Sequence, residues 1–176
     1  MATNVEPVKD KQLITPSGEL ISKRISGLVI NRRPAIEDAR GELVEVYNPA
    51  WGIHAQPMAY AYQASIRPGF VKGWVVHEKQ DDRIYPVIGV MRWVFFDNRP
   101  ESSTYKMLND VTVSEHNRAL IIIPKGVFHA VKNIGTYDAY FINLPTRAYD
   151  HADPDKRRLP VKNDLIPFDF DDPSRW

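Results

Sequence analysis

The sequence predicts an all-β protein with one domain, folded as a closed barrel or as two packed sheets. Fourteen prolines and nine glycines separate short runs of β-branched and aromatic residues, which is the spacing expected of strands joined by turns. A chain of 176 residues fits one domain, and an apolar content of 43% is enough to bury a core. Eight such runs follow one another, and this number favours a barrel or double sheet.

The expected strands extend from the first third of the chain to its last quarter. They are Gly27–Asn31, Glu42–Tyr47, Met58–Ile66, Phe70–His77, Arg83–Asp97, Arg118–Pro124, His129–Lys132 and Asp138–Leu144. Helical turns are expected in only two places. One is the segment around Pro34–Arg40, where Ala35-Ile36-Glu37 lacks strand alternation, and the other lies near Asp155–Arg158.

The two ends of the chain differ in character. Residues 1–25 are polar and weakly patterned, so we expect an N-terminal arm that is either disordered or adds a strand to a partner subunit. Residues 26–176 form the single domain in this interpretation. The last dozen residues contain Pro167, Phe168, Phe170 and Trp176, and this aromatic content predicts a tail that caps the barrel.

The run Arg83–Asp97 is apolar on both faces. Alternation places Tyr85, Val87, Met91, Trp93 and Phe95 on one side and Ile84, Ile88, Val90, Val94 and Phe96 on the other. A strand of this kind is covered on each side. We therefore expect one face to belong to a subunit interface, which favours a homodimer. The alternative is that the C-terminal tail covers that face within one chain.

Composition excludes several classes of protein. The 23 Lys and Arg residues balance 22 Asp and Glu residues, and no charged block exceeds Lys156-Arg157-Arg158, so a nucleic-acid partner is not expected. The absence of cysteine rules out disulfides, thiolate catalysis and cysteine-ligated zinc. Met1–Asp10 has no apolar targeting region, and no stretch approaches the run of roughly 18 apolar residues that a membrane span needs. We expect a cytoplasmic protein without a membrane partner.

The strongest local pattern runs from Pro124 to Asn133 and has the spacing P-x-G-x2-H-x3-N. Pro124 and Gly126 suit a tight turn, after which a strand begins at once and directs His129 inward. This pattern resembles the second motif of the cupin superfamily. The resemblance implies the cupin fold, a double-stranded β-helix or jelly-roll barrel.

The first cupin motif, G-x5-H-x-H-x3–4-E-x6-G, is followed with substitutions from Gly69 to Gly89. Val75 and His77 occupy its two histidine positions, and Asp82 occupies the acidic position. In a metal-binding cupin these residues and the histidine of the second motif hold the ion. His77, Asp82 and His129 could still form a facial triad. We nevertheless expect no metal, because Val75 is more naturally explained by a barrel that never held one.

Further motifs resemble the dTDP-4-dehydrorhamnose 3,5-epimerases over about two-thirds of the chain. Asp38-Ala39-Arg40-Gly41 followed by Glu45 matches the family's D-x-R-G and later acid, and Lys72-Gly73-Trp74 stands in place of its R-G-L-H turn. Asp97-Asn98-Arg99 and Ser102-Ser103-Thr104 match a D-x-R followed by S-x-T, and the match ends at Pro124-Lys125-Gly126 and His129.

The resemblance implies an enzyme without a cofactor that acts on a dTDP-4-keto-6-deoxy sugar. A histidine base held by a carboxylate removes a proton beside the C4 ketone, and a tyrosine returns one on the other face of the sugar. In this sequence the family's base falls on Val75, and the tyrosine falls near Asn143. The carboxylate partner cannot be placed from the sequence.

Substitutes for these groups exist nearby. Residues two apart on a strand point the same way, so His77 shares the face of Val75 and could act as base. Otherwise it is a structural histidine. The candidate catalytic residues are His77, His129, Tyr140, Tyr149 and Arg83, with a tyrosine as proton donor and Arg83 stabilising the enolate. The candidate substrate-binding residues are Arg40, Glu45, Gln63, Lys72 and Arg99. The plainer interpretations are aromatic packing for the tyrosines, a surface cation for Arg83 and a loop salt bridge with Asp38 for Arg40.

Three other functions stay open. A dTDP-sugar 3,4-ketoisomerase, whose signature R-G-x-H-A-H keeps a histidine at the place of His77, fits the loss of one histidine equally well. A cupin that binds a nucleotide sugar or carbohydrate without turning it over would explain Val75 and Asn143. A metal-dependent cupin is the third.

The histidines in polar loops, His54, His116 and His151, are expected to be solvated, and the segment 150–155 is expected to be a turn before the tail.

Overall fold

The computed structural model describes residues 9–10, 12–18 and 21–172, and within them the fold is almost entirely β. The strands are β1 (Val29–Arg32), β2 (Ile36–Asp38), β3 (Gly41–Leu43), β4 (Tyr62–Ile66), β5 (Val71–Val76), β6 (Asp82–Ile88), β7 (Met91–Asp97), β8 (Leu108–Val113), β9 (Ala119–Ile123), β10 (Val127–Asn133), β11 (Ala139–Asn143) and β12 (Arg157–Arg158). A single turn of 3-10 helix, Pro49–Trp51, is the one helical element in the described ranges. No helix in the described part of the chain is long and apolar enough to cross a membrane.

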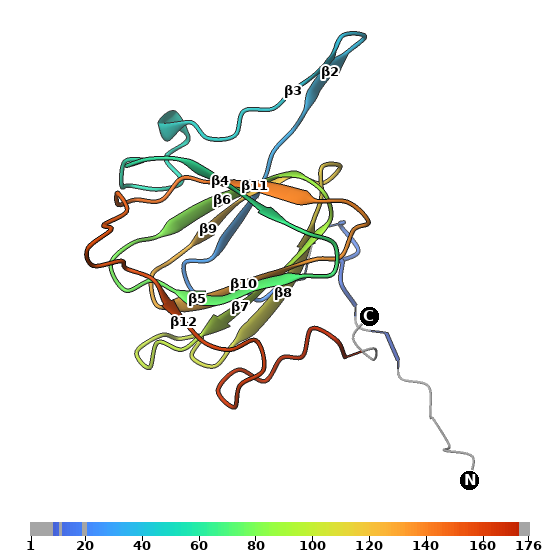
Figure 1. The fold of residues 1–176 in the computed structure, drawn as a ribbon. Helices are drawn as coiled ribbons and strands as arrows, with labels where there is room; N and C mark the ends of the chain where they lie inside the picture. The colour runs from blue at the N-terminus through green and yellow to red at the C-terminus, as the bar shows by residue number, and fades with distance from the viewer. Residues whose placement is uncertain (1–8, 11, 19–20, 173–176) are drawn as a thin grey trace.

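Two five-stranded sheets face each other, and the pairing between strands is antiparallel throughout (Figure 1). One sheet has the order β1-β9-β6-β11-β4, and the other has the order β12-β5-β10-β7-β8. Neighbouring strands in each sheet are mostly distant in sequence, as in a jelly roll. The predicted cupin-type fold is therefore confirmed.

The main core lies between the two sheets. Ile84, Ile121 and Phe141 extend from the first sheet, and Trp93 and Phe95 meet them from the second. These residues alternate with outward-facing neighbours along each strand, which explains the period-two pattern in the sequence. Toward one end of the barrel the apolar filling gives way to polar side chains, and this is where the candidate site lies.

The predicted strand Arg83–Asp97 is wrong in one respect, because it is two strands that belong to different sheets. β6 and β7 are separated at Gly89 and Val90. Gly89 has a φ of 93°, and a Cβ atom there would lie 2.6 Å from the Cβ of Ala139. Only glycine permits this close approach, by which the chain leaves one sheet and enters the other.

The outer face of the second sheet is covered by the C-terminal tail. Val94 of β7 packs in a second apolar cluster with Trp74, Ile166, Phe168 and Phe170, and Figure 1 shows the tail running beneath this sheet. For the β7 part of the doubly apolar run, the tail therefore supplies the cover within one chain. The tail's last aromatic residue, Trp176, lies outside the described residues.

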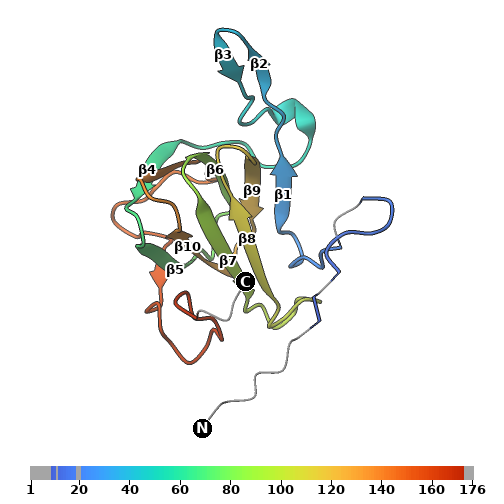
Figure 2. The same ribbon diagram turned by 90° about the vertical axis from the view of Figure 1, so that its right-hand side faces the viewer.

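Other predicted elements also differ from the structure. The segment expected to be helical around Pro34–Arg40 is a β2–β3 hairpin, which projects from the barrel in both views (Figures 1 and 2). Its turn is held by Asp38, whose side chain accepts a hydrogen bond from the backbone N–H of Arg40 at 2.8 Å. The second expected helical segment contains β12 instead, which pairs with β5. β8 was not predicted, since polar Asn109 and Asp110 interrupt its apolar pattern.

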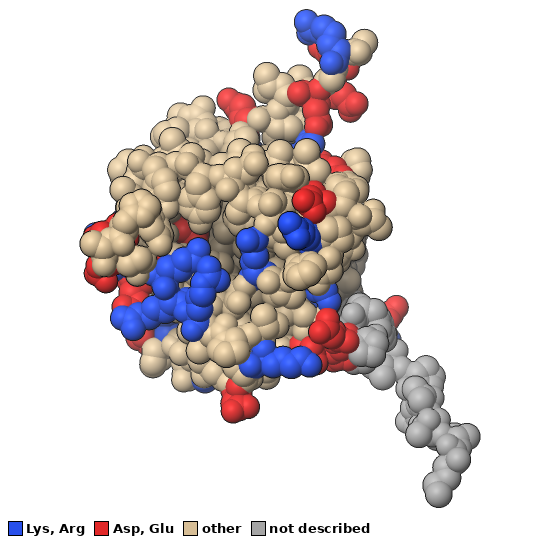
Figure 3. Space-filling view, in the orientation of Figure 1, with Lys and Arg blue, Asp and Glu red and all other residues tan. Residues whose placement is uncertain are grey.

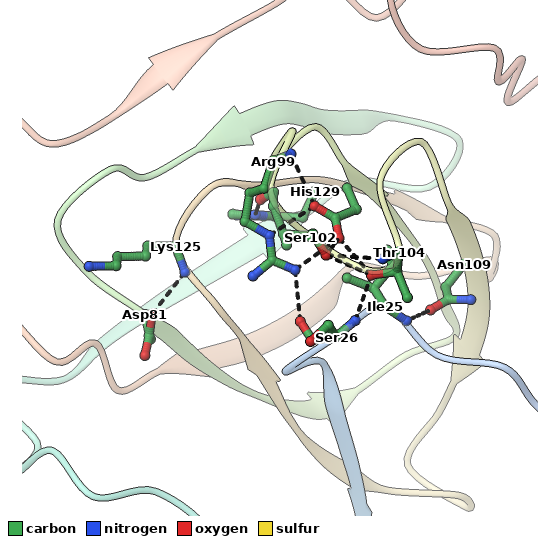
Figure 4. Close-up of polar contacts among 11 residues, drawn as sticks. Ile25, Ser26, Asp81, Arg99, Ser102, Thr104, Asn109, Lys125 and His129 are labelled. Carbon is green, nitrogen blue, oxygen red and sulfur yellow. Dashed lines mark hydrogen bonds and ion pairs between the residues drawn. The ribbon is translucent and has the colours of Figure 1, made fainter.

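The start of the domain is fastened to the barrel by a buried carboxylate. Asp97 accepts hydrogen bonds from Arg99, Ser102 and Thr104. Arg99 also donates to the carbonyl of Ser26 at 2.8 Å, and Thr104 accepts from the N–H of Ser26 (Figure 4). The motifs D-x-R and S-x-T thus form one structural network. Residues 1–8, 11, 19 and 20 of the expected arm lie outside the described residues.

Candidate functional site

Two adjoining cavities lie at the polar end of the barrel. The inner cavity, of about 150 Å³, is enclosed by core side chains of both sheets, including Trp93 and Phe141. The outer cavity, of about 360 Å³, is lined largely by the segment 147–156. Tyr62, His77 and Lys156 line both cavities, so the two volumes meet at these side chains.

A carboxylate between two imidazoles forms the wall of the inner cavity. Asp82 Oδ2 lies 3.2 Å from His77 Nε2 and 3.5 Å from His129 Nε2. The two rings are stacked with centroids 5.8 Å apart. The structure therefore places a carboxylate within 3.5 Å of both histidines, a pairing that the sequence alone did not reveal.

The backbone fixes the tautomer of each ring. His77 Nδ1 donates a very short hydrogen bond to the carbonyl of Asp155, and His129 Nδ1 lies 3.3 Å from the carbonyl of Val127. A carbonyl can only accept, so Nδ1 carries the hydrogen and Nε2 is the atom that can gain or lose a proton.

The environment drives the pKa values of the two histidines apart. Burial lowers the pKa of His77, but the hydrogen bonds to Asp82 and Asp155 and the charges of these two residues together outweigh burial, so the pKa is raised above 6.5. Burial is stronger at His129 and lowers its pKa to about 4. The pKa of Asp82 is raised by burial and lowered more by the two histidines, to about 2. At neutral pH the wall holds an ionised Asp82 and a neutral His129, beside a His77 whose affinity for a proton is raised.

Two turns hold this group in place. Gly126, with a φ of 81°, donates its N–H to the carbonyl of His77 at 2.7 Å, which ties the turn before β10 to the end of β5. The carboxylate of Asp155 accepts from the backbone N–H groups of residues 78, 79 and 80. Gln80 then donates its side-chain N–H to Asp82 Oδ1 at 2.9 Å. The segment 150–155, expected to be a plain turn, therefore positions His77.

Basic side chains border the opening. The pairing of β10 with β5 shifts between His129 and Val131, and this shift brings Lys72 into the same cavity as Val75. Lys156 and Arg158 complete the group, and burial and the charge of Arg158 lower the pKa of Lys156. Figure 3 shows Lys and Arg atoms gathered around the hollow between the two sheets. Such a group suits an anionic ligand.

An unused hydrogen-bond donor also faces the inner cavity. Trp93 Nε1 is the one buried side-chain nitrogen or oxygen without a hydrogen-bond partner in the described part of the chain, and Trp93 lines this cavity. Buried polar groups are normally paired, so an orphaned donor at a cavity wall points to a ligand that accepts from it.

The structure gives Arg83 a role other than the expected one. Its side chain is fully buried on the outward face of β6 and lines neither cavity. The guanidinium donates to the carbonyls of Leu144, Gln56 and Pro57 and to the hydroxyl of Tyr47. Arg83 therefore fastens the segment 47–57 over the sheet and does not face either cavity.

Most other predicted site residues also lie outside the cavities. Gln63 and Tyr140 alternate with inward-facing neighbours on β4 and β11 and point to the outer face of the sheet. Arg40, paired with Asp38 at 2.6 Å, lies on the projecting hairpin, and Glu45 follows it. Arg99 belongs to the network around Asp97 described above. The structure brings together four of the predicted catalytic and binding residues, which are His77, His129, Lys72 and Tyr149. Of these, Tyr149 lies in the outer cavity.

Sequence reasoning missed several lining residues. Tyr62 lies in the predicted strand Met58–Ile66 but was not singled out. Residues four apart on a strand face the same side, so the apolar Ile66 could have indicated that Tyr62 also points inward. Lys156 and Arg158 were read as part of the tail. His54, expected to be solvated, pairs with Asp81 at 2.9 Å and is largely buried.

Comparison with known proteins agrees with this architecture. Residues 22–163 match the sequence profile of the family described as dTDP-4-dehydrorhamnose 3,5-epimerase. The chain is 36% identical over 134 residues to the probable low-salt glycan biosynthesis epimerase Agl13 of Haloferax volcanii, covering 76% of this chain and 86% of that protein. It is 28% identical to the spore coat polysaccharide biosynthesis protein SpsL of Bacillus subtilis, covering 83% of this chain and 96% of SpsL.

Solved structures share the fold. The dTDP sugar isomerase of Desulfovibrio desulfuricans G20 superposes with a TM-score of 0.76 at 22% identity, over 82% of this chain and 91% of that one. The 3'-monoepimerase ChmJ of Streptomyces bikiniensis, in complex with dTDP-quinovose, superposes with a TM-score of 0.68 at 22% identity, over 77% and 70% of the two chains. The profile match, the similarity to Agl13 and the shared jelly roll show that the chain belongs to the dTDP-4-dehydrorhamnose 3,5-epimerase family.

Proposed function

We propose that the protein epimerises a dTDP-linked 4-keto-6-deoxy sugar by removing a proton from a carbon next to the C4 ketone. The family assignment supports an epimerase, and ChmJ, with the same fold, is described in complex with a dTDP-sugar. The observation that carries the proposal is the pair of His77 and Asp82 at the wall of the inner cavity, 3.2 Å apart. It supplies the carboxylate-held histidine that enolisation needs, although Val75 occupies the position where the resemblance places the base.

In this mechanism His77 Nε2 is the base. The carbonyl of Asp155 holds the hydrogen on Nδ1, which leaves the Nε2 lone pair to accept the proton from carbon. The imidazolium that forms is stabilised by the ionised carboxylate of Asp82. The enolate oxygen needs a nearby positive charge or donor, and Lys72 and Trp93 Nε1 in the same cavity offer both.

We place the sugar in the inner cavity and the nucleotide in the outer one. The diphosphate then lies where the two cavities meet, beside Lys156 and close to Lys72 and Arg158. The rings of Tyr60 and Tyr149 line the outer cavity and offer apolar surface to the nucleoside.

The test is proton NMR of the protein with dTDP-4-keto-6-deoxyglucose in deuterium oxide, against a sample without protein. Loss of the C3 or C5 proton signal, followed by new signals of the epimer, is the expected result. A substrate that binds but exchanges neither proton would contradict the proposal. That outcome would favour the second candidate, a protein that binds a nucleotide sugar without turning it over, for which Val75 and Asn143 argue.

Two further candidates can be separated by other measurements. A 3,4-ketoisomerase would move the carbonyl from C4 to C3, which carbon NMR of the product distinguishes from inversion. A metal enzyme is favoured by the ligand atoms of His77, Asp82 and His129, which all lie within 4.8 Å of one another. Elemental analysis of the purified protein, and activity after dialysis against a chelator, decide this case. We expect no stoichiometric metal and no loss of activity.

We also propose that the protein acts as a homodimer in the cytoplasm, where its nucleotide-linked substrate is expected to be. The support for a dimer is the projecting hairpin, on which Ile36 and Leu43 are 71% and 59% exposed. Light scattering during size-exclusion chromatography measures the mass, and a monomer at micromolar concentration would contradict the proposal.

A further inference from the structure

A tyrosine hydroxyl lies beside the position at which the resemblance places the family's tyrosine. Asn143 of β11 stands at that position. Directly across the sheet it pairs with Tyr62 of β4, and the Nδ2 group of Asn143 donates to the Tyr62 hydroxyl at 2.9 Å. Both side chains line the inner cavity. The tyrosine hydroxyl is therefore present on β4, next to the position on β11 where the family carries it.

We propose that Tyr62 is the proton donor of this enzyme and that Asn143 positions it. The inference rests on the epimerase function proposed above. It assigns the second half of the reaction to a residue that neither the motifs nor the family resemblance marks.

Tyr62 and His77 approach the inner cavity from opposite sheets. Tyr62 belongs to the sheet that contains β4, and His77 follows β5 in the opposite sheet. Both line the inner cavity, so a sugar ring bound there lies between them. Inversion at carbon requires that the proton leave from one face of the ring and return to the other, and two groups on opposite walls meet this requirement.

The hydrogen bond from Asn143 determines how the Tyr62 hydroxyl can use its own hydrogen. Asn143 donates to the Tyr62 oxygen and therefore uses one of its lone pairs, which leaves the O–H hydrogen to point elsewhere. Burial, followed by the charge of Asp82, raises the pKa of Tyr62 to about 12. The phenol is thus protonated when the substrate arrives. The amide of Asn143 then stabilises the phenolate that remains after the proton has been given up.

In this reaction one proton leaves the substrate carbon and another replaces it on the opposite face. The C–H bond next to the ketone breaks, its proton goes to His77 Nε2, and its electron pair forms the enolate. The enolate then collapses to the ketone while its carbon takes the proton of the Tyr62 hydroxyl on the opposite face. The products are the epimer, an imidazolium and a phenolate, and exchange with solvent restores both side chains.

The other tyrosines near the site fit this role less well. Tyr149 is 44% exposed and lines only the outer cavity, and Tyr140 points to the outer face of its sheet. Tyr60 stacks on Tyr62 with centroids 5.7 Å apart but lines only the outer cavity. Tyr105 is 45% exposed and lines neither cavity, so it serves as the matched control.

The test compares deuterium exchange with epimer formation in Tyr62→Phe. If Tyr62 is the donor, His77 still removes the proton and can return a deuteron to the same face. We expect exchange into unepimerised substrate to continue while epimer formation falls by about 10²-fold or more. Tyr105→Phe, which removes a hydroxyl outside both cavities, should keep both rates within a few-fold of the original protein. Epimer formation in Tyr62→Phe at a near-normal rate would overturn the proposal.

Two further variants guard against a purely structural effect. Tyr62→Phe combined with Asn143→Tyr returns the hydroxyl to the neighbouring strand and should recover part of the lost epimerisation. If Tyr62→Phe fails to fold, Asn143→Leu carries the test, because it keeps Tyr62 but removes the amide; unchanged epimerisation in this variant would count against the inference. Absence of exchange in the unmodified protein is a different result, since it refutes the epimerase function itself.

Discussion

At the scale of single residues, the chemistry of the site depends on one carboxylate that serves two imidazoles differently. Asp82 raises the proton affinity of His77, whereas burial keeps His129 neutral with a pKa of about 4. Two histidines whose pKa values are driven apart suit separate tasks. In the proposed mechanism His77 exchanges protons, and neutral His129 stays beside the carboxylate without competing for its charge.

This arrangement predicts the pH dependence of the reaction. The base must be neutral to act, so kcat/KM should rise with pH through the pKa of His77, which lies above 6.5. Asp82→Asn removes the charge and the hydrogen bond that contribute most to raising the pKa of His77, while burial continues to lower it. We therefore expect the rising limb to move to lower pH and the maximal rate to fall by about 10²-fold.

The measurement is kcat/KM from about pH 5 to pH 9. Asp81→Asn is the matched control, since Asp81 pairs with His54 at 2.9 Å and lines neither cavity. Its rising limb should match that of the original protein. An unshifted limb in Asp82→Asn would show that His77 is not the titrating base.

At the scale of elements, the features predicted correctly from the sequence are those that neighbouring residues determine, such as tight turns. The P-x-G spacing gave the turn at Gly126 and the inward direction of His129, because a fixed φ and a positive φ leave few alternatives. The apolar run from Arg83 to Asp97 could not be divided from sequence, since strands of two sheets share the same composition. The tail was correctly expected to be apolar, but whether it or a second subunit covers β7 depends on contacts between distant residues.

The tail predicts a measurable contribution to stability. Phe168 is 6% exposed and meets Trp74 edge-on with centroids 6.3 Å apart. Phe168→Ala should lower the free energy of unfolding by about 3–5 kcal/mol, because it leaves a cavity and uncovers the outer face of the sheet. Urea denaturation measures the change. Leu165→Ala, at a side chain 36% exposed, should cost much less, and equal losses would show that the tail does not protect the sheet.

At the scale of the whole molecule, the site is assembled from segments that only the fold brings together. Asn143 meets Tyr62 across 81 residues of sequence, and Asp155 holds His77 across 78. A motif can identify His77 and Lys72 as candidates, but it cannot show which residues from distant segments contact them. For the same reason Arg83 was predicted to lie in the site. Along β6 it alternates with Asp82, which faces the inner cavity, so its side chain points to the outer face of the sheet.

Because the cavities join both sheets and the segment 150–158, a bound nucleotide should stabilise the molecule as a whole. Binding to the folded state adds RT ln(1 + [L]/Kd), about 2.7 kcal/mol when free ligand is 100 times Kd. We expect dTDP to raise the midpoint of thermal unfolding. Lys72→Ala and Arg158→Ala should reduce this rise, and Lys106→Ala, whose side chain lies outside both cavities, should not.

The same titration decides the role of the projecting hairpin. Arg40 is 90% exposed and lies outside both cavities of its own chain, so it cannot contact a nucleotide bound there. If the protein is a dimer whose hairpin reaches the partner's cavities, Arg40→Ala should weaken the stabilisation by dTDP as Arg158→Ala does. If the hairpin only packs against its partner, Arg40→Ala should behave like Lys106→Ala. The comparison therefore tests, in one series, whether the substrate-binding role expected for Arg40 requires a second subunit.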